Sequence, residues 1–396
     1  MSVSRDMQNG VVVWILLFML STAMLLTLSN VLSARNPKQQ ARLQTLTMLA
    51  NAEQALLAYA MQPLGTTQCA LNCPRPGDLP CPDRNNDGVA ESSCSGVGTR
   101  LGRLPWKTLG LGDVRDASGE RLWYAVSEAY KNNPRVLPLN TEAPGSWYVL
   151  NAEFPALDIP QVQAVVAVLI APMQPLTRSD GWLQQRKPQQ SDIAKNYLDM
   201  AATLDNAGAI EASTLGFVAA QPSGNFNDIV WPVTATRMHR AMQQQVMFEL
   251  KRALNCNASS CSILPTPAEI TDSACLGKSS LSAGSCLSSA SSIGRFPLDY
   301  QAHWPLAAQH ILDGDATHHW FQQNGWREQV FYWPHAGGAQ LVVAGEPLPG
   351  QSRQTAAEKS VLAHYVEAAT FQSLAPGTVA LSTAVANDSI DTVIAP

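Results

Sequence analysis

One short stretch, residues 81–94 with the sequence CPDRNNDGVAESSC, carries side chains that could bind a metal ion. Oxygen-bearing residues alternate along it, and a glycine at position 88 stands where a helix-flanked calcium loop makes its sharp turn. The twelfth position of such a loop, normally a bidentate glutamate, is Cys94, so a complete loop is excluded and a calcium ion would need a ligand from elsewhere. The ligands in this pattern would be Asp83, Asn85, Asp87, the Val89 carbonyl and Glu91.

The same stretch has a second interpretation that needs no ion. Asp and Asn are common in turns because their side chains accept hydrogen bonds from nearby backbone amides. A disulfide between Cys81 and Cys94 would close such a turn. Both interpretations stay open on the sequence, and both give the loop a structural role. Apart from a calcium ion, we expect no cofactor.

The eight cysteines fall into two groups of four, each within a segment rich in Pro, Ser or Gly. No CxxC spacing occurs and no histidine lies inside either group, which argues against zinc. An even number of loop cysteines favours disulfides and an oxidising compartment. The disulfide candidates are Cys69, Cys73, Cys81, Cys94, Cys256, Cys261, Cys275 and Cys286.

We find no arrangement of residues typical of an active site, and therefore expect a protein that is not an enzyme. The histidines between residues 303 and 335 lack the i, i+4 pair that places two imidazoles on one helix face. The aromatic segment 320–335 has the strand spacing of a protein core. The glycine-rich segment 95–102 has no lysine after it and no strand before it, unlike a phosphate loop. The histidines are His303, His310, His318, His319 and His335.

Composition narrows the class of protein. The chain has 396 residues, a formal charge of −5 and only 14% charged residues. It is long enough for two domains. No dense patch of Lys and Arg occurs, so we expect no nucleic-acid partner. Abundant Pro and Gly favour a loop-rich, β-containing fold over a helical bundle.

The elements that position these residues begin with an apolar N-terminal segment. Residues 11–31 carry no charge over about the length of a bilayer core, and no clear signal-peptidase site follows. We expect a retained transmembrane helix. Loop charge argues against an outside C-terminus, because Arg35, Lys38 and Arg42 follow the span whereas only Arg5 precedes it. The cysteines favour a body outside the cytoplasm, and this is the location that we expect.

Beyond the span, leucines at helical spacing predict an amphipathic stem, with a kink or break at Pro37. Segments 146–154, 162–172 and 226–237 read as strands, and the last leads into a helix with a methionine-rich apolar stripe. The predicted fold class is α+β. The expected parts are a leader (1–10), a transmembrane and stem helix (11–62), a β-rich module with the Cys/Asp loop (63–254), a Cys/Ser-rich linker (255–295) and a second β-rich module (296–396).

Segments of the second module echo segments of the first in the same order. The pairs are 118–126 with 325–333, 166–176 with 339–348, 195–201 with 363–369, and 227–233 with 387–393. Each match is weak alone, but four in one order predict a degenerate tandem pair.

At this point the sequence resembles a known family. A short leader ending in Gly10, an apolar helix with an amphipathic stem, and the block from Pro76 to Ser127 are similar to the type IV pilin-like proteins of bacteria, in particular large minor pilins and pseudopilins. The similarity covers residues 5–235. It implies a pilin-like first module, cleavage by a prepilin peptidase between Gly10 and Val11, and methylation of the new N-terminus. It also implies packing of the helix against other pilins or pseudopilins.

The sequence departs from the family pattern at two positions. Major pilins have Phe at the first mature position and Glu at the fifth, where this chain has Val11 and Ile15. That glutamate pairs with a neighbour's N-terminal amine inside the fibre, where a lone charge would be costly. A tip subunit has no such neighbour ahead of it. The departure therefore indicates a tip subunit, or else argues against processing.

The resemblance implies a subunit that assembles into or caps a type IV pilus or type II secretion filament. It would sit in the bacterial inner membrane with its body in the periplasm or at a filament tip. Its partners would be the membrane, the peptidase and other pilins. The alternative is an uncleaved, single-pass periplasmic binding or adhesion protein, which differs in the fate of Gly10.

Overall fold

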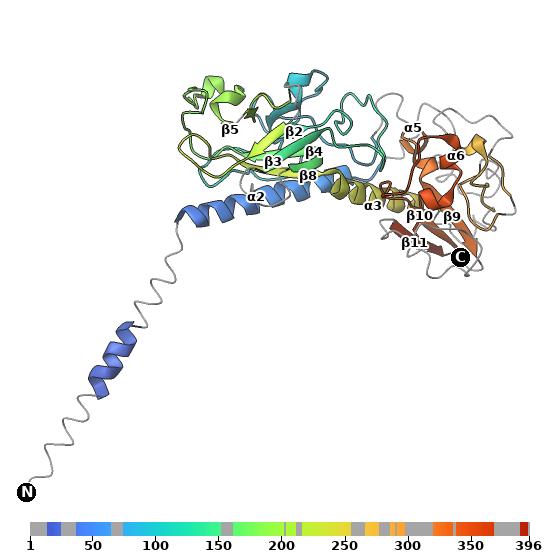
Figure 1. Cartoon of the computed structure of the whole chain (residues 1–396), viewed down its shortest axis with the longest axis horizontal. Coiled ribbons are helices and arrows are strands. Elements are labelled where there is room, and N and C mark those ends of the chain that lie inside the picture. The colour runs from blue at the N-terminus through green and yellow to red at the C-terminus, as the bar shows by residue number, and fades with distance from the viewer. Residues whose placement is uncertain are drawn as a thin grey trace, which may run out of the picture.

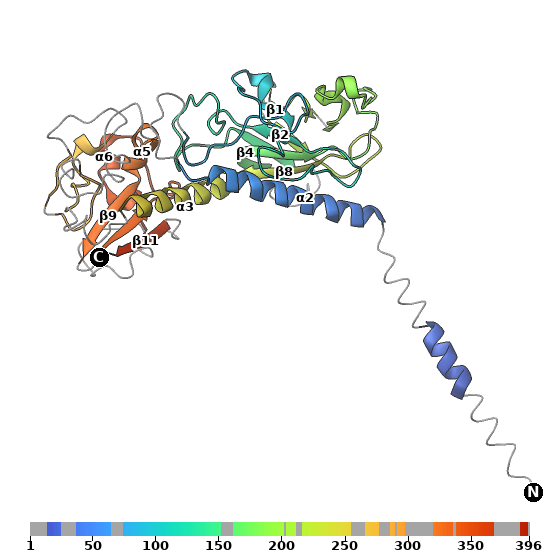
Figure 2. The same cartoon turned by 180° about the vertical axis from the view of Figure 1, so that it is seen from behind.

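The computed structural model combines helices with β-sheets, which confirms the predicted α+β class (Figure 1, Figure 2). It describes residues 14–24, 37–64, 74–151, 161–201, 203–210, 216–254, 266–276, 286–289, 291–297, 320–335, 338–367 and 389–394. The leader with Gly10 and Val11 and much of the predicted membrane span lie outside these residues.

Two helical segments come first in the described chain. Residues 14–24 are helical, and their large apolar side chains are mostly exposed. Helix α2 spans Pro37–Ala60. Proline suits the first position of a helix because its missing N–H would have no partner there, which fits Pro37 as the first described residue of α2. Within the described residues, no helix combines the length and apolar character needed to span a membrane.

Helix α2 is buried along its C-terminal half and exposed at its start. Residues 37–40 are exposed. The helix packs against strands β4 and β8 and against helix α3, and Figure 1 shows it lying along the sheet. The buried side chains are those of Thr45, Leu49, Ala52, Glu53, Leu56, Leu57 and Ala60.

The larger sheet has six strands built around β4. This strand pairs antiparallel with β2, β3 and β8, and β3 pairs in parallel with β7. Val165 to Ala171 of β4 are buried on both faces, one toward the helices and one toward a cluster of aromatic residues. The strands are β1 (Leu101–Arg103), β2 (Trp123–Val126), β3 (Trp147–Asn151), β4 (Gln161–Ala171), β7 (Gly216–Ala219) and β8 (Ile229–Thr234).

Helix α3 (Ala235–Leu254) follows β8 directly and contacts both sheets. The second sheet consists of β9 (Val330–His335), β10 (Gly338–Val343) and β11 (Ser389–Ile394), all antiparallel. One hydrophobic cluster runs from α2 and the first sheet through α3 to Phe296, Trp326 and Tyr332. The two β-rich parts therefore share a core.

Shorter elements complete the described chain. Strands β5 (Met200–Ala201) and β6 (Leu204–Asp205) form a two-stranded sheet. The short helices are η1 (Val97–Arg100), η2 (Pro188–Gln190), η3 (Ala194–Asn196), η4 (Ser273–Cys275), α5 (Trp320–Gln323), η5 (Trp326–Glu328), α6 (Ala356–Lys359) and η6 (Leu362–His364).

The same strand pairings occur in both sheets. In the first, Gly102 pairs with Tyr124, Tyr124 with Leu169, and Leu169 with Trp231. In the second, the corresponding series runs from Gly294 through Tyr332 and Leu341 to Asp391. This structural alignment pairs Tyr124 with Tyr332. The sequence alignment of 118–126 with 325–333 pairs Tyr124 with Phe331 instead, so the two alignments differ by one residue.

Candidate functional site

Two disulfides lie in the described residues, one in each group of cysteines. Cys81 is bonded to Cys94, and Cys275 to Cys286. The prediction of disulfides is thus confirmed for four of the eight cysteines. The other candidates, Cys69, Cys73, Cys256 and Cys261, lie outside the described residues.

The Cys81–Cys94 disulfide closes the predicted metal loop around Asp83. This residue pairs with Arg103 through both backbone hydrogen bonds, which joins the loop to β1. Its buried carboxylate accepts hydrogen bonds from the Gly88 amide (2.7 Å) and the Asp87 amide (3.2 Å). Burial raises the pKa of the Asp83 carboxyl above its ordinary value, although these amides oppose the rise.

The remaining candidate ligands bond within the loop in the same way. The Asn85 and Asp87 side-chain oxygens accept from the Asp87 and Val89 amides at 3.0 and 2.7 Å, and Glu91 accepts from the Arg84 amide at 3.2 Å. Gly88 has φ of +88°, and a Cβ there would meet the Trp106 indole at 2.5 Å. Glycine is therefore required by both the turn and the indole.

The loop forms a polar turn in the structure, and calcium binding by it stays a prediction. Side-chain oxygens of Asp83, Asn85 and Asp87 accept hydrogen bonds from the loop's own amides. Among the described residues, no three His, Cys, Asp or Glu side chains gather as they would around a metal. A carboxylate has about four acceptor sites, so these hydrogen bonds are compatible with calcium binding, for which the loop would still need a ligand from elsewhere.

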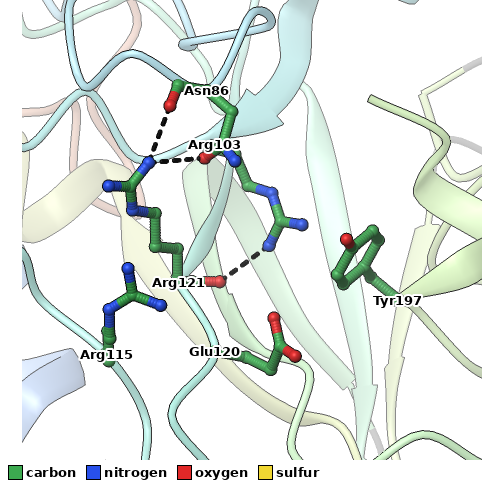
Figure 3. Close-up of a pocket in the computed structure, with 6 residues that line it drawn as sticks. All are labelled: Asn86, Arg103, Arg115, Glu120, Arg121 and Tyr197. Carbon is green, nitrogen blue, oxygen red and sulfur yellow. Dashed lines mark hydrogen bonds between the residues drawn. The ribbon is translucent and has the colours of Figure 1, made fainter. Parts of the chain in front are cut away.

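A polar cavity of about 260 Å³ opens beside this loop (Figure 3). Arg103 comes from the end of β1, Arg115 and Arg121 from the segment before β2, and Tyr197 from the chain after η3. The lining residues are Asn86, Arg103, Arg115, Glu120, Arg121 and Tyr197.

Arg103 lines this cavity and is buried. Its guanidinium carbon lies 4.3 Å from the ring centre of Trp123 and 3.9 Å from that of Tyr197. It donates to the backbone oxygens of Arg121 (2.9 Å) and Ser191 (3.4 Å). Burial lowers the pKa of Arg103 to about 10, so it remains a cation at neutral pH.

Arg115 and Arg121 share one carboxylate. Both donate to Asp113, at 2.7 Å in the shorter contacts, and the hydrogen bond from Arg121 lowers the pKa of Asp113. Arg121 also donates to the backbone and side-chain oxygens of Asn86, at 2.7 and 2.9 Å. Asn86 adopts a positive φ of 64°, which asparagine tolerates. The Cys/Asp loop and the cavity thus form one polar unit.

The histidine and aromatic segments contain no second site among the described residues. His303, His310, His318 and His319 lie outside these residues, and His335 ends β9. The aromatic side chains of Trp326, Phe331 and Tyr332 are buried in the core, as their strand spacing predicts.

Sequence reasoning missed the arginine cavity because its residues come from separate segments. Arg103, Arg115 and Arg121 lie 12 and 6 residues apart with acidic residues between them, and no dense basic patch marks them in the sequence.

Comparison with known proteins gave no match: no family model fits the sequence, and no curated protein or solved structure is significantly similar.

Proposed function

We propose that the chain is a minor pilin or pseudopilin that assembles into, or caps, a type IV pilus or type II secretion filament, and that it has no enzymatic role. The observation that carries this proposal is the arrangement of α2. Its C-terminal half is buried against β4 and β8, while its start at residues 37–40 is exposed. A helix attached to a globular body in this way can carry that body on a shaft.

The helical segment 14–24 supports the proposal. Trp14, Phe18 and Leu20 are each at least 70% exposed, and their apolar neighbours are also open to solvent. Apolar surface of this kind indicates a contact with lipid or with another protein. In the proposed cycle, the segment lies first in the inner membrane and then among the helices of other pilins. Ile15 leaves it without the charge that pairs with a preceding subunit, which suits the tip.

The two disulfides support a periplasmic or extracellular body. Disulfides persist in oxidising compartments and are rare in the cytosol. Cys81–Cys94 and Cys275–Cys286 each close a loop in which few residues could form a core of their own.

We also infer that the second sheet belongs to a degenerate repeat of the first module. The strand pairings correspond, and α3 contacts β10 and β11 as α2 contacts β4 and β8. The surrounding polar contacts correspond too. Gln184 accepts from the Leu176 amide and donates to Asp199, and Gln351 does the same with Leu348 and Glu367. On this basis α3 is the stem helix of the second module.

Site-specific photocrosslinking tests assembly. A photoreactive residue in place of Leu43, which is exposed on α2, should crosslink to a second pilin-like subunit in cells that assemble filaments. The same residue in place of Phe248, exposed on α3, is the matched control and should give no such product. Equal products from both positions, or none from Leu43, would contradict the proposed shaft contact.

A further inference from the structure

We propose that the arginine-lined cavity of the first module binds an oxyanion carried by a small ligand, such as a phosphate ester or a polycarboxylate. The proposal rests on a comparison between the two modules of this chain. It does not depend on filament assembly, so it stands even if the N-terminus is never cleaved.

Both modules contain a buried arginine beside two aromatic rings. Arg103 lies over Trp123 and Tyr197, and Arg295 lies 5.4 and 5.6 Å from the ring centres of Phe331 and Tyr365. Each pairs through its backbone with the residue that follows a proline, Asp83 in one case and Ala268 in the other. This shared arrangement stabilises the fold in both modules and is not specific to binding.

The second module closes the space above its arginine. The Arg295 guanidinium donates at 2.7 Å to the backbone oxygen of Ile270. Glu328 forms an ion pair with Lys359 at 2.5 Å. Gln329, which aligns with Arg121, is buried and accepts a hydrogen bond from Thr141 at 2.6 Å. The Glu328 carboxylate and the Gln329 side-chain oxygen are therefore both bonded to other residues of the protein.

The first module keeps the same space open and adds cations around it. Arg121 replaces the glutamine, and Arg115 is added from the preceding loop. The Cys/Asp loop places the Asn86 carbonyl against Arg121, whereas the second module places the Ile270 carbonyl against Arg295. The difference between the modules is thus an opening lined by arginines in the first module, whose lining residues Figure 3 shows.

The charge of the cavity selects an anion. Three arginines and one glutamate line it, a formal charge of 3 − 1 = +2. Asp113 offsets part of this charge from the edge of the cavity. Arg186 adds a cation next to Glu120, at 3.3 Å from its carboxylate. Low exposure of Arg103 strengthens its field, because a charge surrounded by protein is screened less than one in water.

The arginines still have donors to offer. A guanidinium carries five N–H groups, and Arg115 uses three of them on Asp113 and Gly119. Its side chain is 45% exposed. The planar guanidinium matches a carboxylate or phosphate by two parallel hydrogen bonds. Glu120 can accept from a ligand hydroxyl, which would distinguish a hydroxylated ligand from a bare ion.

Isothermal titration of the full-length protein in detergent tests the proposal, with inorganic phosphate and citrate as probes at constant ionic strength. At least one probe should bind at millimolar concentration or below. Phosphate alone would indicate a phosphate-bearing ligand, and citrate alone a polycarboxylate. The double variant R115Q/R121Q should weaken binding about tenfold or more, because it removes two charge-assisted donors.

Two variants keep the test decisive. R115Q changes only the more exposed arginine and should weaken binding while the thermal unfolding midpoint stays close to that of the wild type. R240Q, at an exposed position on α3, is the matched control and should bind as the wild type does. Failure of both probes to bind, or equal binding by the wild type and R115Q/R121Q, would overturn the proposal.

Discussion

Asp199 and Asp228 form a buried carboxylate pair next to the first sheet. Each accepts a hydrogen bond from the other's backbone amide: Asp199 N donates to Asp228 at 2.8 Å, and Asp228 N donates to Asp199 at 3.1 Å. Burial raises the pKa of both carboxyls, and the charge of Asp199 raises that of Asp228 further. The pair therefore holds a proton to higher pH than an exposed pair would.

This pair predicts a pH-dependent stability. An ordinary aspartate has a pKa of about 4, so the folded state holds more protons than the unfolded state from there up to the raised folded-state pKa. The free energy of unfolding then falls as pH rises through that interval. D228N removes this titration. We expect it to be more stable than the wild type at neutral pH, by about 1.4 kcal/mol per tenfold change in proton affinity, and to lose this advantage near pH 4.

Chemical denaturation at several pH values measures the effect. D192N, at an exposed position in the same part of the chain, should follow the wild-type profile. A D228N profile parallel to that of the wild type would show that Asp228 is ionised in the folded protein.

At the scale of elements, Glu53 connects α2 to the body. Its side chain is buried and accepts from the Trp231 indole at 2.9 Å and from Arg237 at 2.6 Å. Trp231 lies in β8 and Arg237 in the first turn of α3, so one carboxylate links three elements.

E53A should loosen α2 from the sheet. The substitution leaves the Trp231 N–H without its partner, which costs about 1–3 kcal/mol; Arg237 is half exposed and can bond to water. We expect a lower free energy of unfolding and faster amide exchange in residues 49–60. Hydrogen exchange followed by mass spectrometry measures this, with Q54A at the neighbouring exposed position as control. Equal exchange in both variants would contradict the role of Glu53.

Local sequence patterns predict the helices and strands, but they do not predict the arginine-lined cavity. Leucine spacing predicts α2, and β-branched runs predict β3, β4 and β8. The arginine cavity depends on how β1, the loop before β2 and the chain after η3 meet. Such contacts are set by tertiary packing, and no periodicity in the sequence encodes them.

The Cys/Asp loop shows the same limit within one motif. Its spacing matches that of a calcium loop, but the spacing cannot say whether Asp83 faces an ion or the Gly88 amide. Asp83 is buried and pairs through its backbone with Arg103, and that pairing joins segments 20 residues apart.

At the scale of the whole molecule, the described chain combines helix α2 with two β-sheets that both contact α3. The part of the chain with the second sheet packs against the first through α3 and a shared core. A large body of this kind suits a single position in a filament better than a repeated one, because its bulk would otherwise recur at every step along the shaft.

The fate of Gly10 tests the central claim most directly. The intact mass and N-terminal residue of the protein from membranes should be compared between cells with and without a prepilin peptidase. The account predicts a methylated chain that begins at Val11, and an uncleaved chain when the peptidase is missing. A start at Met1 or Ser2 in both cells would contradict it, and would leave an anchored periplasmic protein whose function lies in its binding surfaces.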